Sequence, residues 1–353
     1  DDASQTDPVA AAQRSKRRIQ ALEAEVEALR EGSKKRRADA STTVNRGRLL
    51  RRVVSLFDHV PDLIRENDRR EALADDMLGD DQEEEDAFVP ERLYRGYLRL
   101  VQYLPWMKEK LATADPLDLQ VIYKELRKGA DGARGDDTAS LKGVVVTWLT
   151  EMFHPVEPAL TAHNKTDRGL QHDVTGRLLC PIDYDWDSDE IKTQVRERHP
   201  DYLVTADSFP RFLYDTTKAY DPFNVENGLF KSTLLLRTFM FLFTSPTSAQ
   251  GASAEDAQPG QHADRTSTRS HLRFALSSVS TWRGTDGDFD YEEFYNIIVE
   301  FFEAPPSRGA EHRVKELLLW WDRKVFGRQR VMAVPDARCV SLSVARLAAQ
   351  RLA

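Results

Sequence analysis

The chain has 353 residues, 41% of them hydrophobic and 31% charged, which is typical of a soluble globular protein that carries polar linkers. Its formal net charge of -8 gives no global electrostatic reason to expect nucleic acid or an anionic membrane as a partner. Two cysteines are too few for a disulfide framework, and the most apolar run, residues 234–243, is about half the roughly 20 residues that a bilayer crossing needs. No apolar N-terminal segment resembles a signal peptide, so we expect an intracellular, reducing compartment and no membrane anchor.

Residues 1–44 are interpreted as a basic, partly disordered arm with a short coiled-coil helix. Apolar residues at spacings of 3, 4 and 3 within residues 14–31 occupy the a and d positions of two heptads. This pattern predicts self-association or binding of a protein partner through residues 14–31. The segment is also similar to a basic-region leucine zipper, but no Asn stands at the base-reading position and Gly32 ends the helix, so nucleic-acid binding is only weakly supported.

The arm also contains a basic cluster made of Lys34, Lys35, Arg36 and Arg37. Such clusters are typical of nuclear localisation signals and of nucleic-acid patches, and the alternative is a solvated linker. We therefore expect the nucleus or the cytoplasm as the location.

A helical domain is predicted over residues 45–327 from the periodicity of its apolar residues. The expected elements of its first half are as follows. One helical stripe runs over residues 49–64, a flexible acidic insertion follows at 75–87, and a second helix covers 93–104. A third helix begins at the N-cap Asp115 and ends at Gly129, and the glycine-rich stretch 129–137 is interpreted as a linker. Ser140 is then predicted to cap a helix over 141–152, which His154 and Pro155 end.

The second half of the domain begins with a stretch, residues 158–189, that lacks helical periodicity and is predicted to be irregular. The next expectations are a short helix over 191–198, a strand over 202–204 and a helix capped by Asp207 or Ser208. A helix over 228–243 is expected to have its second half buried on every side, and a flexible insertion is expected over 250–270.

The clearest pattern of the chain lies between Ser280 and Pro306. Asp290 is a plausible N-cap, Ala304 and two prolines end the helix, and five large apolar residues fall on one face: Phe294, Ile297, Ile298, Phe301 and Phe302. A last amphipathic helix covers residues 314–325, and 328–353 are interpreted as a loose basic tail. The fold class is therefore predicted as mainly α, an irregular multi-helix domain preceded by the basic arm.

Four blocks in order carry a resemblance to a known family: residues 168–187, 228–249, 273–282 and 286–303. Together they resemble an uncharacterised domain family of basidiomycete fungi over about residues 85–305. The resemblance implies a fungal, intracellular source and no activity. Members of that family usually have an ordered segment with apolar and Arg-Ala-rich positions before the third block, whereas here residues 250–270 are of low complexity.

Five residues of the irregular segment could hold a divalent cation and activate water for phosphoester hydrolysis: His172, Asp173, Asp183, Asp185 and Asp187. The alternative is a structural loop whose carboxylates cap turns. An EF-hand-like calcium loop over residues 282–293 is weaker, because Trp282 and Gly284 would stand at its first two ligand positions.

Nucleophile and phosphate-loop motifs are absent from the sequence, and Cys180 is interpreted as a small core residue. No catalytic residue and no cofactor is therefore assigned. The favoured function is a non-enzymatic intracellular interaction or scaffold protein, with a nuclear location suggested by the basic cluster. The alternative is a metal-dependent phosphoester hydrolase that uses His172, Asp173 and Asp183–Asp187.

Overall fold

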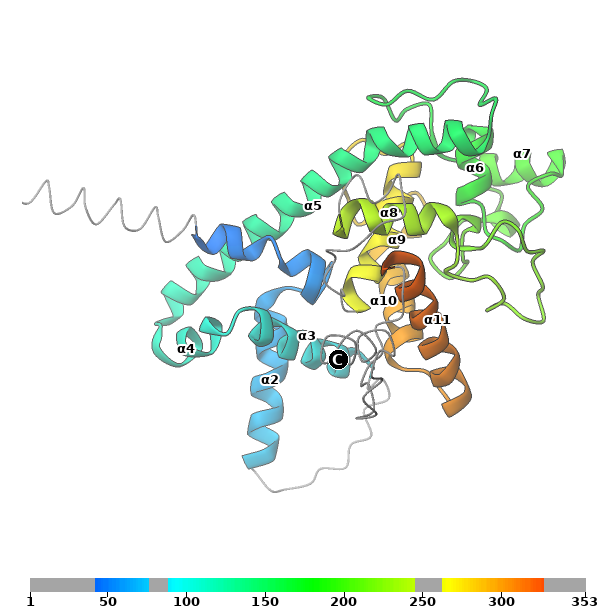
Figure 1. The fold of residues 1–353 in the computed structure, drawn as a ribbon. Coiled ribbons are helices and arrows are strands. Elements are labelled where there is room, and N and C mark those ends of the chain that lie inside the picture. The colour runs from blue at the N-terminus through cyan, green and yellow to red at the C-terminus, as the bar shows by residue number, and fades with distance from the viewer. Residues whose placement is uncertain (1–41, 76–87, 245–261, 327–353) are drawn as a thin grey trace, which may run out of the picture.

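The structure is a computed structural model that describes residues 42–75, 88–244 and 262–326 (Figure 1). The fold is mainly α-helical, as predicted, and the arm, the acidic insertion and the C-terminal tail lie outside the described residues, apart from the last residues of the arm. Residues 42–47 are helical, and the longer helices are α2 (Val60–Asp75), α3 (Phe88–Tyr103), α4 (Trp106–Thr113), α5 (Pro116–Met152), α6 (Asp173–Leu179), α7 (Asp189–Glu197), α8 (Thr233–Phe243), α9 (His262–Leu276), α10 (Tyr291–Glu303) and α11 (Arg308–Phe326). Shorter elements are the π-helical turn η1 (Leu50–Val54), the 3-10 turns η2 (Gly169–Gln171), η3 (Pro200–Tyr202) and η4 (Arg211–Leu213), and the strands β1 (Thr285–Asp286) and β2 (Phe289–Asp290).

Helix α9 lies among the other helices and contacts α5, α6, α8, α10 and η1 (Figure 1). Its buried positions include Ser267, Thr268 and Ser270, each at most 1% exposed. Small side chains allow neighbouring helices to approach closely, so a segment of low hydrophobicity can still occupy the core. The prediction of a flexible insertion over 250–270 is therefore wrong for residues 262–270, and residues 250–261 lie outside the described residues.

Helix α5 runs without a break through the glycine-rich stretch that was predicted to be a linker. The glycines have a packing role instead. A Cβ atom added to Gly129 would lie 1.8 Å from the carbonyl oxygen of Val44, and one added to Gly47 would lie 2.2 Å from that of Leu126. The two backbones cross so closely that only glycine fits, and this contact offsets the low helix propensity of glycine.

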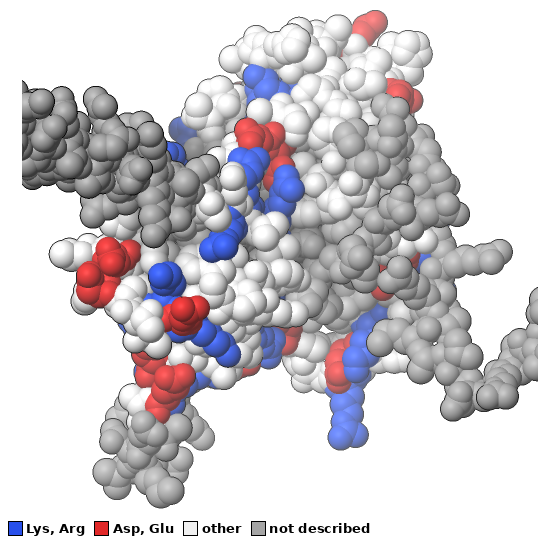
Figure 2. Space-filling view, turned by 60° about the vertical axis from the view of Figure 1, so that its left-hand side comes forward, with Lys and Arg blue, Asp and Glu red and all other residues white. Residues whose placement is uncertain are grey.

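Aspartates of the glycine-rich stretch of α5 form ion pairs with arginines of residues 48–52, the segment that crosses α5. The pairs are Arg48 with Asp136, Arg51 with Asp131, and Arg52 with Asp137. Figure 2 shows one face of the molecule, on which basic and acidic side chains are interspersed and no broad field of one sign forms. Ser140, predicted as an N-cap, is an interior residue of α5 whose hydroxyl donates to the carbonyl oxygen of Asp137.

The helical stripe predicted over 49–64 is interrupted between η1 and α2. Ser55 has an extended backbone, and its hydroxyl accepts a hydrogen bond from the backbone N–H of Asp58 and donates one to the Asp58 carboxylate. That carboxylate also accepts from Arg92 of α3 at 2.7 Å. The buried ion pair between Asp58 and Arg92 therefore holds a turn between η1 and α2, where periodicity alone predicts a continuous helix.

Two apolar clusters make up the core, and α5 contributes to both. The N-terminal cluster includes Leu63, Leu100 and Leu126, and the larger one is formed by the C-terminal half of α5 with helices α6 to α11. A small third cluster, in which Leu56 packs against Tyr295 and Val299, joins the two regions. None of the described helices combines the length and the apolar character that a membrane span requires.

Helix α10 forms as predicted. The Asp290 carboxylate accepts hydrogen bonds from the backbone N–H groups of Glu292 and Glu293, and the helix ends before Ala304. Phe294, Ile298 and Phe302 are buried, while the other two residues of the predicted face, Ile297 and Phe301, are partly buried and pack against the core. Tyr295 and Val299 are also buried, so the helix is covered on a broader face than its periodicity indicates.

Four further expectations are corrected. Residues 173–179, within the stretch predicted to be irregular, form α6, and no strand covers 202–204, where η3 leads into extended chain. The helix expected after Asp207 is the single 3-10 turn η4. Helix α8 begins only at Thr233 after the N-cap Ser232, and its Leu236, Arg237 and Phe241 are only partly buried, so it is not covered on every side.

Candidate functional site

His172 is the central residue of the predicted metal site, and both of its ring nitrogens are engaged. Nδ1 accepts a hydrogen bond from the backbone N–H of Val174 at 3.1 Å, which makes His172 the N-cap of α6. Nε2 lies 2.7 Å from the carbonyl oxygen of Pro158 and must therefore carry the proton. The ring is buried, at 3% exposure, as a neutral structural imidazole, and neither nitrogen offers a lone pair to a metal.

Two of the predicted carboxylates form ion pairs with different arginines. Asp173 accepts from Arg196 of α7 at 2.5 Å, and Asp187 pairs with Arg177 of α6. The hydrogen bond from Arg177 lowers the pKa of Asp187 below its ordinary value. The first pair joins α6 to α7, and the second joins α6 to the loop that follows it.

The other two carboxylates are also used locally. Asp183 accepts a hydrogen bond from the Tyr220 hydroxyl; burial, followed by this bond, raises the pKa of Tyr220 to about 12. Asp185 accepts from the backbone N–H of Asp187 at 3.0 Å, which closes a tight turn. Within the described ranges, no group of three or more His, Cys, Asp and Glu side chains is placed to share a metal ion. The structure thus does not bring the five predicted ligands together, and their geometry follows the alternative of a structural loop.

The structure also does not bring together the carboxylates of the predicted calcium loop. Residues 285–290 form a two-stranded hairpin, in which Thr285 pairs with Asp290 and Gly287 adopts a left-handed backbone, φ 66°. Asp286 accepts from Arg273 and Asp288 from Arg198, while Asp290 caps α10. The three carboxylates thus have separate partners.

Cys180 is completely buried in the larger core cluster. Its burial raises the pKa of the thiol to about 12. A thiol in this setting is a poor nucleophile, so Cys180 is a core residue, as predicted.

A closed surface loop, residues 215–228, is the feature that sequence reasoning missed. The backbone N–H of Asp215 donates to the carbonyl oxygen of Gly228 at 2.9 Å, which joins the two ends of the loop. At its tip Phe223 is 98% exposed. The only sequence signal is a set of turn-forming residues around one apolar side chain, Asp221, Pro222, Asn224 and Gly228, and such a signal carries no periodicity.

The backbone around Phe223 is held by local hydrogen bonds. The Asp221 carboxylate accepts from the N–H of Phe223, and the Asp221 carbonyl oxygen accepts from the N–H of Asn224, both at 2.9 Å. Glu226 forms a two-point ion pair with Arg313 of α11, at 2.7 and 2.9 Å. The loop is therefore tied to the helical body while its aromatic side chain projects into solvent.

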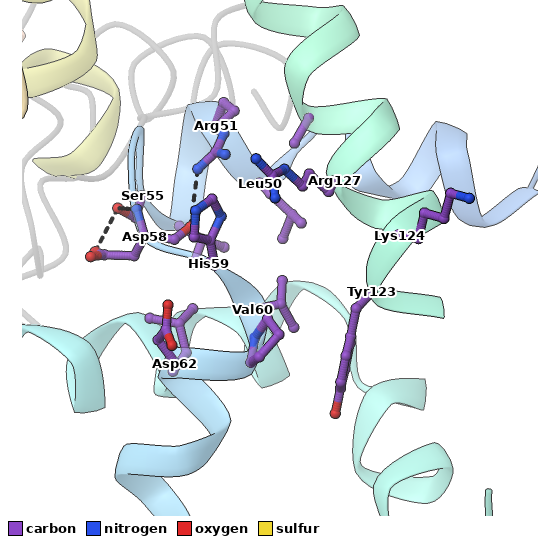
Figure 3. A pocket seen from close by; sticks show the side chains of 14 residues that line it. Leu50, Arg51, Ser55, Asp58, His59, Val60, Asp62, Tyr123, Lys124 and Arg127 are labelled. Atoms are coloured by element: carbon purple, nitrogen blue, oxygen red, sulfur yellow. Dashed lines mark hydrogen bonds between the residues drawn. The ribbon is translucent and has the colours of Figure 1, made fainter. Parts of the chain in front are cut away.

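A cavity of about 360 Å³ lies between η1, the start of α2 and the N-terminal half of α5 (Figure 3). Its wall is largely apolar and includes Leu50, Val60 and Tyr123. Two buried charged groups of this wall serve the fold: Arg51 donates to the carbonyl oxygen of Asp58, and the Asp58 carboxylate pairs with Arg92. We therefore do not assign a ligand to this cavity.

A second cavity, of about 510 Å³, is bounded by η2, the C-terminal end of α7, the end of α9 and the β1–β2 hairpin. We call it the arginine cavity, because five arginines line it: Arg168, Arg196, Arg198, Arg273 and Arg283. All of its lining residues lie between Thr166 and Asp288.

The chain matches a known protein family. Neither a curated protein nor a solved structure matches the chain. A family described as a family of unknown function, DUF6698, matches residues 128–326, a range that begins inside α5, ends with α11 and covers more than half of the chain. The arginine cavity and the Phe223 loop both fall inside it. The chain therefore belongs to the family of unknown function DUF6698.

Proposed function

We propose that the chain is a non-enzymatic interaction or scaffold protein, and that Phe223 is an anchor for a partner protein. The observation that carries this proposal is the 98% exposure of Phe223 on a loop whose backbone is already ordered. Single exposed apolar residues are common on proteins. A large aromatic side chain on an ordered backbone, however, loses less conformational entropy on binding, and aromatic residues are frequent hot spots of interfaces.

The charge of the loop suggests the kind of partner. Residues 215–228 contain three acidic residues, Asp215, Asp221 and Glu226, against one basic residue, Lys218, so the formal charge of the loop is -2. We therefore expect a protein with an apolar pocket that receives the phenyl ring and with basic residues on the rim of that pocket.

The test compares Phe223→Ala with Leu117→Ala as a matched control, because Leu117 is an apolar residue of α5 that is also exposed, at 73%. Proteins captured by the wild-type chain are compared with those captured by each variant, and the dissociation constant of each candidate is then measured with purified proteins. We expect Phe223→Ala to weaken the interaction by about tenfold or more, since a hot spot contributes about 2 kcal/mol. Equal binding by the two variants would contradict the proposal.

We further propose that residues 14–31 mediate self-association and that Lys34–Arg37 direct nuclear import, both on the sequence patterns of a segment that lies outside the described residues. Deletion of residues 1–40 should reduce the mass measured by light scattering, and alanine at the four basic positions should remove nuclear accumulation of a fluorescent fusion. Unchanged mass or unchanged distribution argues against the respective role. We also propose a fungal origin for the chain, because four of its sequence blocks resemble a domain family of basidiomycete fungi.

The alternative, a metal-dependent phosphoester hydrolase, is not favoured by the contacts of His172, Asp173 and Asp183–Asp187, because each side chain has another partner. Metal analysis of the purified chain tests it. A stoichiometric divalent metal that is lost in Asp183→Asn would restore the hydrolase hypothesis, and a content well below one equivalent counts against it.

A further inference from the structure

The arginine cavity has two chemically different walls. One wall, from η2, α6, α7 and η3, combines apolar side chains, among them Leu179, Tyr202 and Leu203, with three of the five arginines, Arg168, Arg196 and Arg198. The opposite wall, from the end of α9 and the hairpin, presents guanidinium and hydroxyl groups, including Arg273, Ser278 and Arg283. A cavity of this kind suits a small molecule with an organic part and a charged group.

The charge of the lining is positive although the chain as a whole carries -8. Five arginines line the cavity against two carboxylates, Asp286 and Asp288, so the formal charge of the lining is +3. Both carboxylates are already paired, Asp286 with Arg273 and Asp288 with Arg198. Arg196 also has a carboxylate partner, Asp173, which lies outside the lining. Positive groups in a concave site concentrate the field there and attract an anion.

Arg273 is a buried donor of this site, at 3% exposure. Its Nη1 donates to Asp286 and to the Tyr291 hydroxyl, and its guanidinium carbon lies 3.3 Å from the centroid of the Phe289 ring. Nε is buried and has no hydrogen-bond partner among the described residues. A buried cationic N–H group without a partner is costly, and an anion in the cavity would be a suitable acceptor.

The rim supplies donors that no other group uses. Arg283 and Ser280 are exposed, and within the described ranges neither side chain has a hydrogen-bond or ion-pair partner. Ser278 is held close to η2, because Gly169 has a left-handed backbone, φ 81°, and a Cβ atom added there would lie 3.2 Å from the Ser278 hydroxyl oxygen. These three donors thus come from one segment, residues 278–283, which follows α9 and packs against η2.

We propose that the arginine cavity binds a small organic phosphate, a phosphomonoester whose phosphate lies on the wall of Arg273 and Arg283 and whose organic part contacts Tyr202 and Leu203. A phosphomonoester carries a charge of about -1.5 to -2 at neutral pH, which matches a lining of +3 better than a single carboxylate does. The guanidinium group also fits two phosphate oxygens at once. This inference involves residues other than those of the Phe223 loop and stands independently of the proposed function.

The experiment is titration calorimetry of the full chain at low ionic strength with four probes: glycerol 3-phosphate, adenosine 5′-monophosphate, inorganic phosphate and citrate. Arg283→Ala is compared with Arg308→Ala, which removes an exposed arginine outside the cavity lining. Because Arg283 and Arg308 are both exposed, the two variants should keep the wild-type melting temperature, so that a change in affinity reports on the site. We expect one phosphomonoester to bind with 1:1 stoichiometry and about tenfold more weakly to Arg283→Ala, while Arg308→Ala binds like the wild type.

A second variant separates the two walls. Leu203→Ser changes the apolar wall, and we expect it to weaken binding of adenosine 5′-monophosphate while leaving that of inorganic phosphate unchanged. Three outcomes overturn the proposal: no saturable binding of either phosphomonoester, equal affinities of Arg283→Ala and Arg308→Ala, or tighter binding of citrate or inorganic phosphate than of both phosphomonoesters.

Discussion

The ammonium nitrogen of Lys165 lies 3.5 Å from the centroid of the Phe274 ring and donates a hydrogen bond to the carbonyl oxygen of the same residue. Its neighbour Arg168 donates to the next carbonyl oxygen, that of Ala275, at 2.8 Å. These are carbonyl groups at the C-terminal end of α9, where positive charge is favourable. Two buried cations from a loop about a hundred residues earlier in the sequence therefore cap the central helix.

We predict that the burial of Lys165, which outweighs these favourable contacts, makes its contribution to the stability of the protein rise with pH. Burial, and secondly the charge of Arg168, lowers the pKa of Lys165 from 10.5 to about 7. Between these values the unfolded chain binds more protons than the folded chain, so the free energy of unfolding increases as the pH rises. From about pH 7 to about pH 9.5 the contribution of Lys165 is about 3 kcal/mol.

The measurement is urea unfolding across this pH range for the wild type and for Lys165→Met, which keeps the length of the side chain and removes the titrating group. Other groups contribute to both curves, so the difference between them isolates Lys165. The free energy of unfolding of the wild type should increase relative to that of Lys165→Met as the pH rises, and parallel curves would show that Lys165 titrates normally.

Gly129 should tolerate no side chain, because a Cβ atom there would lie 1.8 Å from the backbone oxygen of Val44. We expect Gly129→Ala to lower the free energy of unfolding by about 1–3 kcal/mol. Gly135 is the matched control: it lies in the same helix, and a Cβ atom there meets nothing within 4 Å. Gly135→Ala should raise stability by about 0.5–1 kcal/mol through helix propensity, and two variants of equal stability would refute the close crossing.

The N-cap of α10 is predicted to contribute about 1 kcal/mol to stability. Asp290→Ala removes the oxygen that accepts from the N–H groups of Glu292 and Glu293, whereas Asp290→Asn keeps an acceptor there. Thermal unfolding should therefore show a loss in the alanine variant and a much smaller change in the asparagine variant. Equal losses would mean that the charge of Asp290, and not its capping bond, is important.

Cys180 should be unreactive toward a thiol reagent while the protein is folded, since burial raises its pKa to about 12 and the thiolate is the reactive species. In the Cys339→Ser variant, where Cys180 is the one remaining cysteine, we expect labelling only after denaturant is added. Rapid labelling of the folded variant would contradict the burial of Cys180.

Local patterns predicted α10 and the ends of several helices correctly, because a helix start, an apolar stripe and a helix stop depend on residues within one or two turns of each other. The prediction failed at Gly129 and at Ser267–Ser270, where glycine and small polar residues indicate a linker. These residues are helical because distant segments pack against them, and no short-range pattern reports such a neighbour.

The same difference between local patterns and long-range contacts applies to the candidate sites. The sequence by itself determined which residues could bind a metal, His172 and four aspartates, and it determined the mainly α-helical class through apolar periodicity. Only the tertiary structure decided that each of those side chains has its own partner, and that Arg273 and Arg283 line one cavity with loops from far away in the chain. The physical reason is that ion pairs and cavities arise from contacts across the fold, whereas helices are selected largely by their own residues.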